Sequence, residues 1–181
     1  MNLIRASLLF ASLSVVAACG ASGDKSAPAP ASAVATPASA VAALSETEVR
    51  AVVDAAEAAS KNMDVAAAVA TLSEDVRFTF VQPASPAQSI GREQIIADMG
   101  KTATDSRDRT YTSQVGGVRM AADGASAAVD VQVSEQMTVQ GHKVETTSDQ
   151  TYTVARRQGQ AKIVAMTSKL TGLVMDGEKR L

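Results

Sequence analysis

From about residue 109 to residue 170, apolar and polar side chains alternate along the chain with a period of two. This period is typical of strands that bury one face and expose the other, so it restricts this half of the chain to antiparallel sheet. A pair of glycines, Gly116 and Gly117, predicts a bulge inside the first strand. Turn residues divide the segment into four predicted strands: residues 109–120, 127–140, 143–155 and 161–170.

The two central strands are joined by Gly141 and His142, which are favoured as the two residues of a tight turn. In that register Glu135 pairs with Ser148, and one face of the hairpin is mostly apolar while the other is wholly polar. A slip by one residue would mix the two faces, so the pattern selects which side chains point inward. His142, at the tip, is expected to be a solvated turn residue and not a catalyst.

A group of polar residues interrupts the apolar face of this hairpin. Glu135, Ser148 and Gln150 lie at its centre, with Thr146 and Tyr152 at its edges. A carboxylate on a buried face is costly unless it is hydrogen-bonded or reaches water. Two interpretations stay open: either the group lines a pocket that solvent can reach, or the sheet bends there and Glu135 extends into bulk water.

The segment before the sheet predicts helices. A first helix begins at Ser45, which fits a capping box with Glu48, and Asp64 caps a second, shorter helix. Residues 75–80 are predicted as a strand and residues 91–99 as a third helix, with prolines between them that stop regular structure. Helices followed by a run of strands indicate an α+β fold.

Composition argues against several kinds of partner and cofactor. The chain carries 17 Lys and Arg against 19 Asp and Glu. Its arginine pairs, Arg107 with Arg109 and Arg156 with Arg157, are expected to be solvated, so nucleic acid is not an expected partner. Aromatic residues are scarce and tryptophan is absent, which disfavours stacking platforms for sugars or single strands. With one histidine and one cysteine, we expect no metal and no cofactor.

The N-terminus has the layout of an export signal. A positive residue, Arg5, precedes an apolar run over residues 6–18 that is too short for a stable membrane span. Residues 16–19 resemble the lipobox of bacterial lipoproteins, with Cys19, the single cysteine, at the end. The resemblance implies that residues 1–18 are removed and that Cys19 receives acyl chains such as palmitate. The alternative is an ordinary signal peptide with an incidental cysteine.

Four segments follow from these patterns: a signal peptide over residues 1–18, a lipidated cysteine with a disordered Ala/Ser/Pro tether over 19–44, a folded domain over 45–172 and a polar tail over 173–181. The tether would hold the domain clear of the lipid headgroups. The lipobox-like residues imply the cell envelope. By resemblance to lipoprotein sorting rules, Gly20 after the cysteine implies the periplasmic face of the outer membrane in a cell that has one.

The order of elements from residue 45 to residue 170 resembles the NTF2-like superfamily, especially its SnoaL-like and ketosteroid-isomerase-like branches. Three motifs carry the resemblance: EDVRF at residues 74–78, GREQII at residues 91–96 and QAKI at residues 160–163. The resemblance implies an α+β cone, in which N-terminal helices pack on a curved antiparallel sheet around a pocket. The chain departs from the family at Ala161, where tryptophan is usual, and in having no tyrosine in its first two helices.

Two functions from different classes are expected of such a domain. The first is non-catalytic binding of a small apolar molecule in the cone, or of another envelope protein on the sheet, by a monomer or weak homodimer with a polar outer face. The second is proton transfer by Glu135, with Tyr152 or Ser148 as the donor. The predicted pocket residues are Glu135, Thr146, Ser148, Gln150 and Tyr152.

Overall fold

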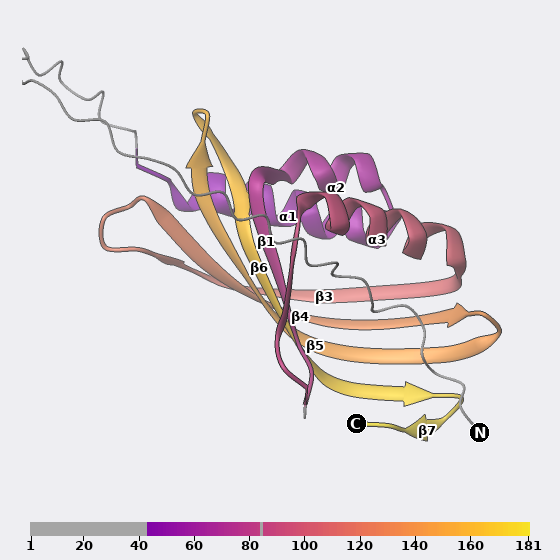
Figure 1. The fold of residues 1–181 in the computed structure, drawn as a ribbon. Coiled ribbons are helices and arrows are strands. Elements are labelled where there is room, and N and C mark those ends of the chain that lie inside the picture. Colours follow the sequence, from indigo (N-terminus) through magenta and orange to yellow (C-terminus); the bar gives the residue numbers. More distant parts are fainter. Residues whose placement is uncertain (1–42, 84) are drawn as a thin grey trace, which may run out of the picture. The chain divides into compact units, whose positions relative to one another are not determined.

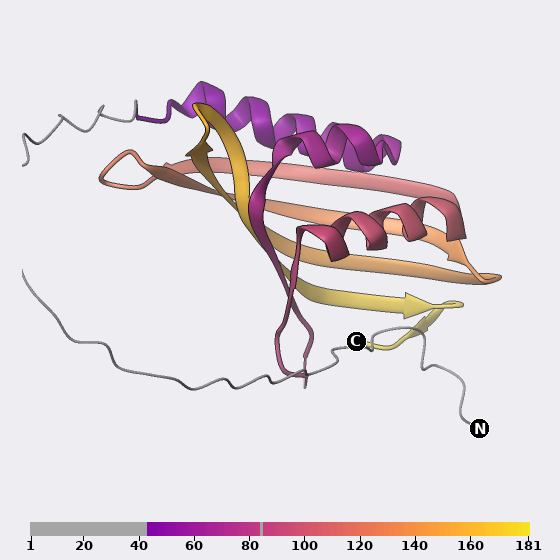
Figure 2. The same ribbon diagram turned by 45° about the horizontal axis from the view of Figure 1, so that its top comes forward.

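The computed structural model describes residues 43–83 and 85–181. In chain order, its elements are α1 (Glu46–Asn62), α2 (Val65–Thr71), β1 (Leu72–Val81), β2 (Gln88–Gly91), α3 (Arg92–Asp105), β3 (Ser106–Met120), β4 (Ser126–Val139), β5 (His142–Arg157), β6 (Gln160–Met175) and β7 (Glu178–Lys179). The predicted signal peptide, Cys19 and the predicted tether up to residue 42 lie outside the described residues. The three helices lie along one face of the sheet (Figure 1, Figure 2), which is the predicted α+β arrangement.

The strands form one curved, unclosed sheet in the order β2-β1-β6-β5-β4-β3, with β7 paired to β6. The paired strands are antiparallel except β1 and β6, which run parallel, so the sheet is mixed. The strands predicted over residues 109–170 pair antiparallel with one another as expected, whereas the antiparallel sheet that the resemblance implied contains one parallel pair. Parallel neighbours need a long crossover, and here β2, α3 and the β3–β5 meander separate the two strands. The alternation of apolar and polar residues predicts that a segment is a strand, but it does not predict whether that strand runs parallel or antiparallel to a partner far away in the sequence.

Both predicted helix caps are confirmed. The Ser45 hydroxyl accepts from the backbone N–H of Glu48 at 3.3 Å, and Glu48 Oε2 accepts from the Ser45 N–H at 2.9 Å. Asp64 Oδ1 accepts from the backbone N–H of Ala67 at 2.9 Å, which caps α2. These side chains satisfy N–H groups that a helix start leaves without intrahelical partners, so the sequence fixes where α1 and α2 begin.

The packed part of the chain begins before Ser45. Leu44, which the sequence placed in the tether, is only 6% exposed and belongs to the core. Its N–H donates to the Gly124 carbonyl at 3.0 Å, and Arg156 donates to the Ala43 carbonyl at 3.0 Å. Leu44 was assigned to the tether because the residues before it are mostly small and predict disorder. Its apolar side chain is nevertheless stabilised by burial against the sheet.

The β4–β5 hairpin has the predicted faces but a different register. Gln140 and Gly141, with φ of 53° and 85°, are the turn residues, so Glu135 pairs with Thr146 and not with Ser148. A tight two-residue turn of this kind needs positive φ at both central positions, with glycine favoured at the second. The register differs from the prediction by two residues, and a shift of two returns every side chain to its original face.

The sheet also continues past the predicted end of the domain at residue 172. β6 runs to Met175, which pairs with Val144, and β7 pairs back onto β6. Residues 173–175 and 178–179 are therefore strand and not tail. The first half of β5 needs hydrogen-bond partners for its backbone, and residues 173–175 supply them.

Two further details concern the course of the strands. The register of β3 against β4 shifts between Val115 and Val118, which confirms the bulge predicted at Gly116 and Gly117. β2, which the sequence did not predict, pairs antiparallel with β1 across the proline-containing loop. The prolines end one strand, as expected, and the chain then resumes pairing.

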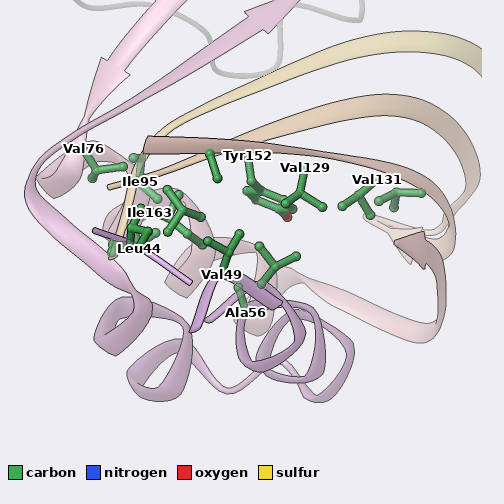
Figure 3. Packing of buried hydrophobic residues seen from close by; sticks show 14 residues of the cluster. Leu44, Val49, Ala56, Val76, Ile95, Val129, Val131, Tyr152 and Ile163 are labelled. Atoms are coloured by element: carbon green, nitrogen blue, oxygen red, sulfur yellow. The ribbon is translucent and has the colours of Figure 1, made fainter. Parts of the chain in front are cut away.

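The core lies between α1 and the inner face of the sheet. Figure 3 shows Leu44, Val49, Val129 and Ile163 gathered there. Each such side chain contributes about 1.5–3 kcal/mol when it is removed from water. The largest fully buried side chains are Ile163, Val49, Val53, Val76, Val129, Val131 and Val154.

Candidate functional site

A cavity of about 280 Å³ lies between the helices and the inner face of the sheet, beside the core. A cavity that is mostly apolar, with a few polar groups, is the usual form of a ligand pocket. Its apolar lining consists of Ala56, Ala59, Met63, Val65, Ala68, Leu72, Phe78, Ile90, Ile95, Met99 and Met166. Its polar lining consists of Ser60, Thr71, Asp98, Thr102, Arg109, Tyr111, Glu135, Gln150 and Tyr152.

The cavity follows from a change in side-chain size along α1. Val49 and Val53 fill the space between the first half of the helix and the sheet. Ala56, Ala59 and Ser60, one to two turns later, line the cavity instead. Because these small side chains stop short of the sheet, space is left that the methionines of the opposite walls do not fill. Methionine is unbranched and adapts its shape, so this lining can accommodate different ligands.

A buried carboxylate, Glu57 of α1, is joined to the cavity wall by two hydrogen bonds. Glu57 is 6% exposed, and two tyrosines of the sheet donate to it. Tyr152 Oη donates to Glu57 Oε1 at 2.7 Å, and Tyr111 Oη donates to Glu57 Oε2 at 2.9 Å. Tyr152, labelled in Figure 3, extends from β5 toward α1. Both tyrosines line the cavity whereas Glu57 does not, so the phenols stand between the cavity and the carboxylate.

The protonation of the two phenols follows from their surroundings. Burial, and then the negative charge of Glu57, raise the pKa of both Tyr111 and Tyr152 well above the usual value of 10. Both residues are therefore neutral at physiological pH, and each has a single proton to donate. The Tyr111 proton goes to Glu57, and the Tyr152 hydroxyl donates to Glu57 and also lies 3.1 Å from Gln150 Oε1.

Sequence reasoning missed Glu57, although a signal was present. Glu57 follows Val49 and Val53 at intervals of four residues, which places it on the same buried stripe of α1. A carboxylate on such a stripe needs hydrogen-bond donors. Its donors lie 54 and 95 residues further along the chain, so their arrival beside Glu57 depends on the tertiary fold.

Arg109 and Glu135 form an ion pair in the cavity wall. Arg109 Nε donates to Glu135 Oε1, and the two side chains are 12% and 18% exposed. Arg109 Nη1 also donates to the Ser60 carbonyl at 2.6 Å, near the C-terminal end of α1, where the helix dipole favours a cation. The guanidinium carbon lies 4.7 Å from the centroid of the Tyr111 ring.

The expectation that these arginines are solvated was therefore wrong for Arg109. It was also wrong for Arg156, whose side chain is 13% exposed and pairs with Glu48 at 2.9 Å. The two arginines contact opposite ends of α1. Their partners come from distant parts of the chain, so neighbouring residues in the sequence give no sign of them.

The structure brings together three of the five predicted pocket residues. Glu135, Gln150 and Tyr152 line the cavity, whereas Thr146 and Ser148 are not among its lining residues. Ser148 is nevertheless tied to a lining residue, because its Oγ accepts from Gln150 Nε2 at 3.3 Å. Glu135 faces the cavity and not bulk water, which favours the first of the two interpretations of the polar group.

The predicted catalytic pairing of Glu135 with Tyr152 or Ser148 is not formed in the described part of the chain. The Tyr152 hydroxyl donates to Glu57, and Glu135 is held by Arg109.

His142 lies at the β4–β5 hairpin, exposed, with Nδ1 2.7 Å from Asp176 Oδ2. In residues 43–83 and 85–181, no three His, Cys, Asp or Glu side chains gather as metal ligands do. Of the helices described, none combines the length and the hydropathy of a membrane span.

Comparison with known proteins identifies the fold. No protein-family model matches the sequence, and no curated protein matches it either. Several solved structures, in contrast, match the fold of this chain. A ketosteroid isomerase-like protein from Erwinia carotovora atroseptica matches with a TM-score of 0.55 at 15% identity, over 70% of this chain and 95% of that one. An NTF2-like protein from Cytophaga hutchinsonii matches with a TM-score of 0.51 at 16% identity, over 67% and 94%.

The chain has the NTF2-like fold. A type 2 hexachlorocyclohexane dehydrochlorinase shares this NTF2-like fold, with a TM-score of 0.56 at 8% identity over 71% of this chain and 86% of that one. Proteins of quite different activity thus use the NTF2-like fold, and the likeness shows the fold alone. What this NTF2-like domain does must be argued from its cavity.

Proposed function

We propose that the cavity binds a small, largely apolar molecule and does not transform it. The observation that carries this proposal is an apolar cavity whose tyrosine and arginine side chains are already held by carboxylates: Tyr111 and Tyr152 by Glu57, and Arg109 by Glu135. Its volume of about 280 Å³ is near the lower end for ligand pockets, and benzene fits an apolar cavity of about 150 Å³. A ligand with one aromatic ring and a short substituent suits this space.

Thermal unfolding with ethylbenzene tests the proposal. A ligand that binds only the folded state raises Tm. We expect ethylbenzene to raise the Tm of the wild-type chain but not that of Ala68→Leu, because the larger side chain on α2 occupies the cavity. Ala51→Leu, at an exposed position of α1, is the matched control and should respond as the wild type does. No response in the wild type, or equal responses in all three chains, contradicts the proposal.

Proton transfer by Glu135 is the second candidate function, because its carboxylate lines the cavity. Such an enzyme needs a donor that faces the substrate, whereas the Tyr152 proton is engaged by Glu57. Incubation of acetophenone with the protein in D₂O separates the two functions. Deuterium incorporation at its methyl carbon, lost in Glu135→Gln, would favour the enzyme. Binding without incorporation supports the binding protein.

We further propose that the domain is anchored in the cell envelope, at the outer membrane, through acyl chains on Cys19. The support comes from the lipobox-like residues 16–19 and the apolar run before them. Metabolic labelling with an alkyne fatty acid, followed by separation of the membranes on a density gradient, tests this. We expect label and outer-membrane recovery for the wild-type chain, and loss of both for Cys19→Ala. A labelled Cys19→Ala chain would contradict the anchor.

A further inference from the structure

We infer that the ligand carries a protonated amine beside its apolar body and that the cavity discriminates against carboxylates. This inference rests on the proposed function, since it concerns the ligand of the same cavity. It follows from the charges around the cavity and from the direction of the hydrogen bonds made by its two tyrosines.

The first argument concerns Glu57. Both of its carboxyl oxygens accept hydrogen bonds from phenols, which is the pattern of an ionised carboxylate. In the part of the chain that the structure describes, no Lys, Arg or His forms an ion pair with it. A buried carboxylate held only by neutral donors leaves a negative potential in its surroundings, because the medium there screens charge weakly.

The second argument is the charge of the remaining wall. The carboxylate of Glu135 is balanced by Arg109. Asp98, which lines the cavity from α3, accepts from Gln94 Nε2 at 2.6 Å and so from a neutral group. Two carboxylates shielded from bulk water, Glu57 and Glu135, therefore adjoin or line the cavity with one guanidinium, and the solvent-exposed Asp98 adds a third negative charge that water screens more strongly. An ammonium group would reduce this imbalance, and a ligand carboxylate would increase it.

The third argument concerns the hydrogen bonds available to a ligand. Tyr111 and Tyr152 each have one proton. Tyr111 donates it to Glu57, and the Tyr152 hydroxyl has two acceptors, Glu57 Oε1 at 2.7 Å and Gln150 Oε1 at 3.1 Å. A ligand group that reaches either phenolic oxygen therefore meets lone pairs and must itself supply the hydrogen. The Gln150 amide can still donate an N–H to a ligand, but this donor is neutral and does not offset the charge of an anion. An ammonium, with three N–H donors, suits the tyrosine end best.

Three probes with one aromatic body test the inference: 2-phenylethylamine, 2-phenylethanol and 3-phenylpropionate. Calorimetric titration of the full chain at pH 7 should give the amine the lowest Kd, about tenfold or more below that of the acid, with the alcohol between them. If none of the three binds and ethylbenzene does not bind either, the proposed function itself fails. If the alcohol binds but the acid binds as well as the amine, the proposed function stands and this inference is overturned.

Charge-changing variants give the matched comparison. Glu57→Gln removes the unbalanced charge and should bring the Kd values of amine and acid together. Glu135→Gln leaves Arg109 without its carboxylate and should do the same, so either variant suffices if the other does not fold. Asp54→Asn removes an equal charge from an exposed position of α1 and should leave the preference unchanged. An amine preference that survives both cavity variants, or that disappears in Asp54→Asn, contradicts the inference.

Discussion

The two halves of α1 face the same sheet, but the N-terminal half packs into the core whereas the C-terminal half lines the cavity. At the N-terminal end, Leu44, Val49 and Val53 fill the space above the sheet, and Arg156 pairs with Glu48. At the C-terminal end, small side chains leave a cavity, a carboxylate replaces the next valine of the stripe, and Arg109 contacts the last turn. The backbone is equally helical at both ends. Side-chain size and charge alone therefore decide which end is core and which end can receive a ligand.

The largest expected effect comes from truncation at the packed end. Ile163→Ala should lower the free energy of unfolding by about 3 kcal/mol, because a fully buried side chain leaves an unfilled hole. Met166→Ala, on the same strand but in the cavity wall, should cost less than half as much, since its space joins one already open. Urea denaturation measures both. Equal losses would mean that the two regions are packed alike.

A polar substitution tests the other end. Tyr152→Phe leaves one oxygen of Glu57 without its phenol donor, so it should lower the free energy of unfolding by about 2 kcal/mol. Tyr111→Phe should cost less, because Tyr111 is only partly buried and its site can admit water. Thermal and urea denaturation of the two variants provide the comparison. A neutral Tyr152→Phe would show that Glu57 does not depend on this phenol.

Enlarging an alanine at each end should reveal the difference in free space. Ala127→Leu, in the packed core, should destabilise the fold by about 1.5 kcal/mol through crowding. Ala59→Leu places the same added volume in the cavity and should change stability little. Urea denaturation gives both values. The reverse order would contradict the assignment of the empty space to the second half of α1.

The smallest effect is expected at the surface of the packed end and depends on pH. Hydrogen bonds from the Ser45 backbone and hydroxyl, and from Arg156, hold the pKa of Glu48 below its usual value of 4.5. The folded state therefore prefers the ionised carboxylate, so its stabilising contribution is complete above pH 4.5. The contribution is lost as the pH falls from there through the lower pKa of the folded state.

The comparison of wild type with Glu48→Gln measures this contribution. The difference in Tm between the two chains should be present at pH 7 and should shrink as the pH is lowered below 4.5. A difference that is constant across this range would assign the effect of the substitution to something other than the charge of Glu48.

The sequence predicted the faces of the sheet better than the partners of its residues. Alternation along β4 and β5 correctly placed Glu135, Gln150 and Tyr152 on the inner face, because each side chain's face depends only on local geometry. The register depended on which two residues adopt positive φ, and the choice of Gly141 with His142 instead of Gln140 with Gly141 shifted every pair.

The candidate site was predicted only in part, for a related reason. Polar residues on a buried strand face predicted a site, but their hydrogen-bond partners lie in distant parts of the sequence. Glu57 reaches Tyr152 across 95 residues, and Arg109 reaches the carbonyl of Ser60 across 49. A one-dimensional pattern shows that a buried polar group needs a partner, and only the fold supplies its identity.

The attachment of Ala43 and Leu44 has a mechanical consequence. Any tension on the chain ahead of residue 43 enters the domain there, through the Leu44–Gly124 and Ala43–Arg156 hydrogen bonds and the buried leucine side chain. α1 has 17 residues and is therefore about 25 Å long. Force is thus taken up by the turn between β3 and β4, by Arg156 of β5 and by the core side chains around Leu44. The far end of the helix, where the ligand is proposed to bind, stays outside its direct path.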